Sequence, residues 1–270
     1  MLSLHYEAHM IWHHRAPAHP TIIDTHMTYR IFLAGATGAI GRRLTPMLRA
    51  AGHTVIGTTQ SPERVDALRT HGAEPVVVDV FDAAALTRAV VSARADTVIH
   101  QLTDLPKGLD PSRMTEAIAR NARIRTEGTR HLVDAALAAG VRRLIAQSIA
   151  WAYASGPEPH REDDPLDVGA EGNRGVSVGG VVALETAVLQ APPLEGFVLR
   201  YGQLYGPDTG ADVPAGSAPL HVDAAAYAAL LAIDHGMPGI YNIAEPNANV
   251  TTDKARAQLG WRADFRLRAS

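Results

Sequence analysis

The stretch "AGATGAIGRRL" (34–44) decides how the chain is interpreted, because three glycines recur in it at intervals of three residues. Gly35 permits a tight turn, Gly38 lets backbone N–H groups approach a phosphate, and Gly41 lets a following helix pack closely against a sheet. The N-terminus of such a helix presents partial positive charge to an anion. The stretch therefore predicts a phosphate-binding turn; the alternative is a glycine-rich turn that holds no ligand.

The segments around this turn alternate between strands and helices. The apolar run Tyr29–Ala34 predicts a buried parallel strand, and the amphipathic segment Gly38–Ala51 predicts a helix. Further strands are expected at 53–59, 74–80, 96–103, 142–148, 196–201 and 239–243, and further helices near 62–72, 83–94, 112–139, 178–190, 223–235 and 252–259. This alternation predicts an α/β fold, a Rossmann-type doubly wound parallel sheet, with a small C-terminal substrate-binding region.

The chain is expected to divide into three parts. Residues 1–28 are interpreted as a flexible leader, 29–175 as the dinucleotide-binding core, and 176–270 as the remaining strand and helices with the substrate region, intertwined with the core. Six of the 13 histidines fall within the first 26 residues, but their spacing matches no known site, so no metal is expected. Met27 is the expected native start, because a strand follows it at once.

Composition excludes several classes of function. The chain has no cysteine, which excludes disulfides and thiolate chemistry. No apolar run reaches the roughly 18–20 residues that span a bilayer. The net charge of −3, without a long run of one sign, predicts neither a nucleic-acid surface nor a membrane patch. A small-molecule substrate and a cytoplasmic location are therefore expected.

The end of the second expected strand bears on the choice of cofactor. NAD-binding proteins of this fold carry Asp or Glu there, to hold the ribose 2′-hydroxyl. This chain has "TTQ" (58–60) instead, with Arg42 and Arg43 after the third glycine and Arg64 beyond the strand. These residues favour NADP, whose 2′-phosphate an arginine accommodates, and NAD stays open.

Several further motifs extend over roughly residues 29–262. They are "GATGAIG" (35–41), "VVVDVFD" (76–82), "EGTRHLVDAALAAGVRRLIAQS" (127–148), "LRYGQLYGP" (199–207), "HVDAAAYA" (221–228), "GIYNI" (239–243) and "LGW" (259–261). In this combination the chain resembles the extended short-chain dehydrogenase/reductases, the NAD(P)-dependent epimerase/dehydratase family. The resemblance implies an oxidoreductase or epimerase/dehydratase-like enzyme. It leaves open a homodimer formed through helices near 112–139 and 178–190.

The glycine turn and the resemblance together indicate which residues contact the cofactor. Asp79 and Val80 would lie on its adenine side, and Tyr205 would shape the nicotinamide and substrate pocket. The full expected set is Gly35, Thr37, Gly38, Ala39, Ile40, Gly41, Arg42, Thr58, Thr59, Asp79, Val80, Gln101, Leu102, Thr103 and Tyr205.

The family's proton-transfer residues are missing from their expected positions. Its tyrosine and lysine lie four residues apart on one helix, where the lysine lowers the pKa of the phenol. Aligned on Glu185, these positions hold Ser177 and Val181, and the family's serine or threonine position holds Ile149, with Ser148 beside it. This chain therefore lacks the Tyr-x-x-x-Lys pair.

Three residues are candidates to replace the missing acid. Tyr153 and Ser148 lie near the end of the fifth expected strand, and His100 ends the fourth. Packing is the alternative role for Tyr153 and His100. Arg125, where relatives often hold asparagine, would either clamp an anion or pair on a helix surface.

Three functions stay open on this sequence. The first is a reductase or epimerase/dehydratase-like enzyme with a substituted proton donor. The second uses the same cleft for non-redox isomerisation, elimination or cyclisation. The third is a non-catalytic protein that senses NAD(P). In the segment "VSVGGVVALE" (176–185), Gly179 and Gly180 disfavour a helix, which predicts a close approach by another backbone or a ligand.

Overall fold

A seven-stranded parallel sheet forms the centre of the molecule in the computed structural model, which describes residues 27–106, 108 and 110–267. The strand order is β3-β2-β1-β4-β5-β6-β9. Strands β2 and β3 are added on one side of β1, and β4 and the later strands on its other side, parallel to β1. This is the doubly wound α/β fold that the sequence predicts. The expectations for residues 1–26 lie outside the described residues.

The strands of the central sheet are short and mostly buried on both faces. They are β1 (Arg30–Ala34), β2 (Thr54–Thr59), β3 (Glu74–Val77), β4 (Thr97–His100), β5 (Arg143–Ile149), β6 (Glu195–Tyr201) and β9 (Gly239–Ile243). Every neighbouring pair is parallel. Because helices cover both faces, the strands are continuous apolar runs rather than alternating ones.

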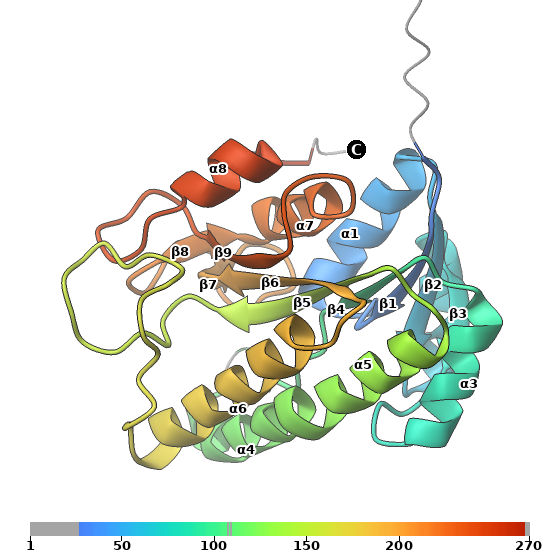
Figure 1. Ribbon diagram of the computed structural model, residues 1–270, viewed down its shortest axis with the longest axis horizontal. Helices are drawn as coiled ribbons and strands as arrows, with labels where there is room; N and C mark the ends of the chain where they lie inside the picture. Colours follow the sequence, from blue (N-terminus) through green and yellow to red (C-terminus); the bar gives the residue numbers. More distant parts are fainter. Residues whose placement is uncertain (1–26, 107, 109, 268–270) are drawn as a thin grey trace, which may run out of the picture.

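Helices cover the sheet in two layers (Figure 1). One layer holds α1 (Ala39–Ala50), α2 (Val65–Thr70), α7 (Val222–Leu231) and α8 (Asp253–Leu259). The other holds α3 (Ala83–Ala93), α4 (Met114–Arg123), α5 (Thr129–Ala138) and α6 (Gly172–Leu189). Two hydrophobic cores, one on each face, result from this arrangement.

The structure differs from the sequence-based expectation in three elements. The helix expected at 112–139 contains a π-helical turn, η4 (Ile124–Gly128), between α4 and α5. Helix α6 begins at Gly172, six residues before the expected start at 178. A second, two-stranded parallel sheet pairs β7 (Gln203–Tyr205) with β8 (Pro219–His221), although the sequence shows no strand signal at either segment.

Glycine has different effects at adjacent positions of α6. A Cβ on Gly180 would lie 3.1 Å from the Cα of Ala122, so α4 approaches α6 closely there, as expected. At Gly179 a Cβ would meet no atom within 4 Å. Close packing against a neighbouring backbone therefore explains Gly180 but not Gly179.

Candidate functional site

The glycine turn between β1 and α1 has a backbone that other residues would disturb. Gly35 adopts a φ of +92°, and a Cβ there would lie 2.6 Å from the carbonyl oxygen of Gln101. At Gly41 a Cβ would collide with the carbonyl oxygen of Gly35. Gly38 precedes the first turn of α1, and its N–H donates to Gly35 O at 3.1 Å. The turn thus leaves the N-terminus of α1 open to a phosphate.

A cavity of about 410 Å³ runs from this turn across the carboxyl ends of β1, β2 and β4. Nine of the expected cofactor residues line it: Gly35, Thr37, Gly38, Thr58, Thr59, Val80, Gln101, Leu102 and Thr103. The other six do not: Ala39, Ile40, Gly41, Arg42, Asp79 and Tyr205. Each residue's contact with a cofactor stays a prediction, but the shape and the glycine cradle fit a dinucleotide.

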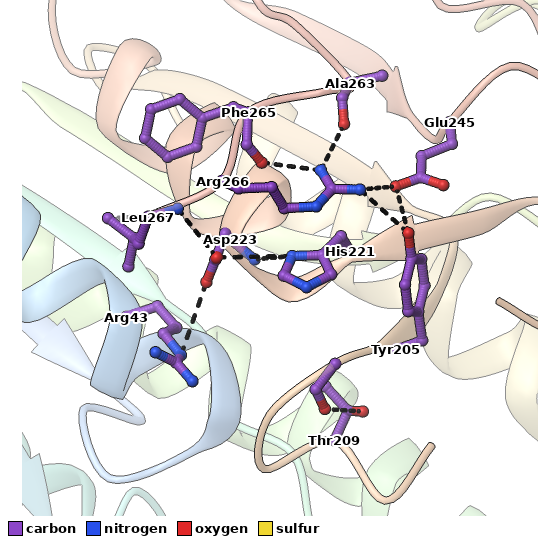
Figure 2. A network of polar contacts seen from close by, with 11 residues as sticks. Arg43, Tyr205, Thr209, His221, Asp223, Glu245, Ala263, Phe265, Arg266 and Leu267 are labelled. Carbon is purple, nitrogen blue, oxygen red and sulfur yellow. Dashed lines mark hydrogen bonds and ion pairs between the residues drawn. The ribbon is translucent and has the colours of Figure 1, made fainter. Parts of the chain in front are cut away.

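The three arginines expected to favour NADP lie in different surroundings. Arg42 donates through Nε to Thr37 O at 2.9 Å and pairs with Asp208 at 3.3 Å. Arg43 points toward Asp223, with 3.6 Å between Nε and the carboxylate (Figure 2). Only Arg64 lines the cavity. The basic group available at the end of β2 is therefore Arg64.

One aromatic side chain that the sequence did not single out also lines the cavity. Phe81 lines the cavity, and the guanidinium of Arg123 lies over its ring, 3.9 Å from the centroid. Nearby, the amide of Gln60 donates to Asp79 at 2.8 Å. The signal was the phenylalanine directly after "VVVDV"; its pairing with α4 depends on the tertiary structure.

A buried polar network occupies the base of α6. Ser148, at the end of β5, donates its hydroxyl to Glu185 at 2.8 Å. Arg200 on β6 donates to both carboxylate oxygens of Glu185, at 2.9 and 2.7 Å. All three side chains are buried. The hydroxyl proton of Ser148 is thus directed at Glu185, and its catalytic role stays a prediction.

The positions of the family's other proton-transfer groups are apolar. Val181 is fully buried, and it packs with Ile149, Ala152 and Val178 in one small cluster. Ser177, one turn earlier on α6, is half-buried. Helix α6 therefore carries the aliphatic hydroxyl of Ser177 in place of the family's phenol, and the buried aliphatic side chain of Val181 in place of its ammonium group.

Tyr153 is held by packing and a hydrogen bond. Its hydroxyl donates to Asn242 Oδ1 at 2.6 Å. Its ring stacks on His160 with 4.8 Å between centroids, and the Arg200 guanidinium lies 4.9 Å from its centroid. Burial raises the pKa of Tyr153, which opposes proton exchange near neutral pH. A catalytic role stays a prediction, and these contacts favour the packing role.

His100 is buried beneath the cleft. Its Nδ1 accepts from the Leu102 N–H at 3.2 Å, so the ring proton belongs on Nε2, which lies 3.1 Å from Thr129 Oγ1. Burial, with the nearby charge of Arg125, lowers the pKa of His100 to about 4. The ring is neutral at pH 7, and both nitrogens have partners in the protein. Its catalytic role also stays a prediction.

The C-terminal segment ties down the phenol of Tyr205, as Figure 2 shows. The hydroxyl donates to Glu245 at 2.8 Å, and Arg266 donates to the same carboxylate oxygen at 2.7 Å. The ring lies edge-on to His221, with 5.1 Å between centroids. Tyr205 therefore anchors the loop after β7, and its predicted contact with the cofactor would involve its ring or backbone rather than a free hydroxyl.

The described part of the chain has neither a membrane-spanning helix nor a metal-ligand cluster. No helix there is long and apolar enough to cross a membrane. No group of three or more histidine or carboxylate side chains gathers there as metal ligands would. The glycine turn and its cavity are thus the features that define the site, and they are those of a Rossmann-type dinucleotide-binding protein.

Comparison with known proteins identifies the family. A family model described as NAD(P)H-binding matches residues 35–173. A 3-diazoavenalumate denitrifying reductase of Streptomyces sp is 43% identical over 238 residues, covering 80% of this chain and 76% of the relative. The chain belongs to the NAD(P)H-binding family.

More distant relatives agree with the fold. A dTDP-4-dehydrorhamnose reductase of Streptomyces griseus is 32% identical over 66% of this chain and 50% of that protein. Among solved structures, the UDP-glucose 4-epimerase of Thermotoga maritima superposes with a TM-score of 0.70 at 19% identity, covering 89% of this chain and 94% of the epimerase. WbmG of Bordetella bronchiseptica, solved with NAD and UDP, gives 0.68 at 19% identity, covering 91% and 92%.

Proposed function

We propose that this protein is an NAD(P)H-dependent reductase whose acceptor takes up hydride without a proton from the protein. One observation carries the proposal: the glycine cradle is complete, whereas the family's lysine and serine positions hold Val181 and Ile149 in an apolar cluster, and its tyrosine position holds Ser177. A carbonyl that accepts hydride becomes an alkoxide and needs a proton donor. An acceptor that is already cationic does not.

An aryl diazonium ion is the acceptor class that we favour. The name of the Streptomyces relative describes a reductase that removes nitrogen from a diazo carboxylate. A diazonium group carries a positive charge, so hydride addition gives a neutral product. The missing tyrosine and lysine are then a consequence of the substrate and not a defect of the enzyme.

The reaction balances without any further reactant. The bound nicotinamide supplies one hydride to the acceptor. The terminal nitrogen of Ar–N≡N⁺ gains that hydride and becomes Ar–N=N–H. The C–N bond then breaks, dinitrogen leaves, and the hydrogen ends on the aryl carbon as Ar–H. The positive charge lost by the substrate is the charge gained by the oxidised cofactor.

The protein's own residues have three tasks in this scheme. The N–H groups at the N-terminus of α1 bind the pyrophosphate, as the open turn at Gly38 allows. The buried cluster around Val181 leaves an aliphatic side chain where the family has its ammonium group, so that position has no charge to repel a cationic acceptor. The salt bridge between Glu185 and Arg200 fixes α6 against β5 and β6, so that this apolar cluster keeps its place.

A coupled assay tests the proposal. Diazotised 3-aminocinnamate is mixed with NADPH deuterated at the transferring C4 position, and absorbance at 340 nm, dinitrogen and deuterium in the cinnamate are followed. We expect cofactor oxidation and dinitrogen in a 1:1 ratio, above a control with heat-inactivated protein, and deuterium in the cinnamate to the extent that the diazene N–D reaches the aryl carbon before it exchanges with water. Product without cofactor oxidation would indicate non-redox chemistry, and cofactor binding without any product would indicate a sensor. Either result would reject the reductase.

NADP is the cofactor that we favour. The end of β2 carries no carboxylate, and Arg64 lines the cavity beside Thr59 and Gln60. Replacing Arg64 by alanine should weaken NADPH binding by about tenfold, because a guanidinium–phosphate pair is lost, and leave NADH binding nearly unchanged. Fluorescence titration of both cofactors measures this. Equal losses for NADPH and NADH, or NADH bound more tightly by the wild type, would contradict the assignment.

A further inference from the structure

Arg125 lies where the α4–α5 helix pair meets α6. It belongs to the π-helical turn η4, which interrupts regular helix geometry between the two helices. A Cβ on Gly180 would lie 3.5 Å from the Cβ of Arg125, so the side chain starts beside α6, one residue before Val181. Such π-turns often occur at functional sites, because one inserted residue redirects the side chains of its turn.

The guanidinium of Arg125 has no hydrogen-bond or ion-pair partner in the described part of the chain. Its side chain is nevertheless half-buried. Glu185 is the carboxylate that acts on it electrostatically, but Arg200 and Ser148 already bind the oxygens of Glu185. Burial lowers the pKa of Arg125 to about 10. The protein therefore holds this charge at a cost in free energy.

Neighbouring arginines on the same helices show the contrast. Arg120 donates to Asp104 at 2.6 Å, and Arg123 donates to Glu127 at 2.7 Å. Arg123 is exposed, whereas Arg120 and Arg125 are both half-buried. Of the two half-buried arginines, Arg120 has a carboxylate partner and Arg125 has none among the described residues, which is the arrangement expected when a ligand supplies the anion.

The position of Arg125 indicates which ligand this is. The cofactor's phosphates belong at the N-terminus of α1, in the opposite helix layer. Arg125 acts electrostatically on His100, at the end of β4, and its side chain begins next to α6. In this fold the nicotinamide and substrate lie toward that half of the sheet edge. The anion that reaches Arg125 therefore comes from the substrate.

We propose that Arg125 binds the carboxylate of the substrate, and so selects aromatic acids over their neutral counterparts. The inference rests on the proposed function in placing a reducible substrate beside α6. A planar guanidinium pairs with a planar carboxylate through two parallel hydrogen bonds.

The test measures binding, which does not depend on turnover. Cinnamate and methyl cinnamate are titrated calorimetrically into the protein saturated with NADP⁺. The wild type should bind the acid about tenfold or more tightly than the ester, the change that one charge-assisted pair produces. Arg125→Met should lose this preference by weakening the acid alone, and Arg125→Lys should keep part of it.

A matched control separates this role from a general loss of positive charge. Arg130 is exposed on α5, about one turn away, and Arg130→Met should leave both affinities unchanged. The affinity for NADP⁺ should be the same in all variants. If Arg125→Met does not fold, Arg125→Lys and Arg125→Gln supply the comparison. An acid preference retained in Arg125→Met or Arg125→Gln, or absent from the wild type, overturns the inference.

The two proposals fail in different ways. If diazotised 3-aminocinnamate is not reduced but Arg125→Met abolishes the acid preference, the reductase proposal fails and the carboxylate site stands. If reduction occurs and the preference is independent of Arg125, the carboxylate site fails and the reductase stands.

Discussion

The β1–α1 turn and helix α6 differ in how much of the family pattern they keep. At the β1–α1 turn, the glycines at 35, 38 and 41 are all present and the backbone closes around them. At α6, the helix and Glu185 are retained, but the proton-transfer positions hold Ser177 and Val181. The turn is fixed by backbone geometry, which only glycine permits. The pattern on α6 depends on side chains, and a change of chemistry can replace them without loss of the fold.

This contrast separates cofactor binding from catalysis within one site. The salt bridge from Glu185 to Arg200 keeps α6 in place against the sheet. The helix therefore retains a structural task after its chemical one is gone. Four predictions follow the comparison from the largest expected effect to the smallest.

Replacing Glu185 by alanine should produce the largest loss of stability. Arg200 would stay buried without its carboxylate, and breaking one partner of a buried pair costs about 3–5 kcal/mol. Urea unfolding followed by circular dichroism measures the change. Glu116→Ala, at an exposed salt bridge on α4, is the control and should alter stability little. A small effect at Glu185 would show that α6 is held by apolar packing alone.

Stability should also depend on pH through His100. Its pKa falls from 6.5 to about 4 on folding, so between these values the unfolded chain binds more protons. Stability is then lost as pH falls from about 6.5 to 4, by an amount on the order of 3 kcal/mol, since one pKa unit is about 1.4 kcal/mol. Urea unfolding at several pH values should show this slope.

Two variants check the source of that pH dependence. His100→Gln should flatten the slope, because no titrating group remains at the buried position. His71→Gln, at an exposed histidine beyond α2, should keep it. A slope that is unchanged in His100→Gln would assign the effect to other groups.

Gly41→Ala should disrupt the turn that backbone geometry dictates. The added methyl would collide with the carbonyl of Gly35 and the backbone of Ala36, so the turn must shift. We expect NADPH binding to weaken by about tenfold or more, because the pyrophosphate loses its cradle. Fluorescence titration measures it, and unchanged affinity would mean that the turn tolerates a Cβ.

Gly179→Ala gives the matched comparison on α6 and the smallest effect. The position is exposed within α6, and a Cβ there meets nothing within 4 Å. Alanine should stabilise the protein by about 0.5–1 kcal/mol, because glycine weakens a helix interior. Thermal unfolding measures this. A loss of stability would show that Gly179 has a conformational role that its surroundings do not reveal.

Much of the fold could be predicted from local sequence. The glycine turn, the apolar strands and the doubly wound order all follow from the alternation of segments, and the sheet confirms them. The start of α6 was predicted wrongly, because Gly179 and Gly180 suppress helix propensity while packing against α4 stabilises the helix back to Gly172. The β7–β8 pair was missed, because Gln203–Tyr205 and Pro219–His221 are too short to show a pattern.

The candidate site was predictable where spacing carries the information. Nine expected residues line the cavity, since they follow strands whose carboxyl ends must meet at one edge of the sheet. The contact between Phe81 and Arg123 was not predicted, because it joins the segment after β3 to α4, and these lie far apart along the chain.

The sequence by itself determined the parallel sheet, the phosphate turn and the absence of the tyrosine–lysine pair, because each depends on residues that are near one another in the chain. Tertiary structure decided the state of individual side chains. It paired Ser148 with Glu185, buried the ring of His100, and left Arg125 beside α6 with no hydrogen-bond or ion-pair partner among the described residues. Burial and long-range pairing set the charge and availability of a group, and neither is visible until the strands and helices are packed together.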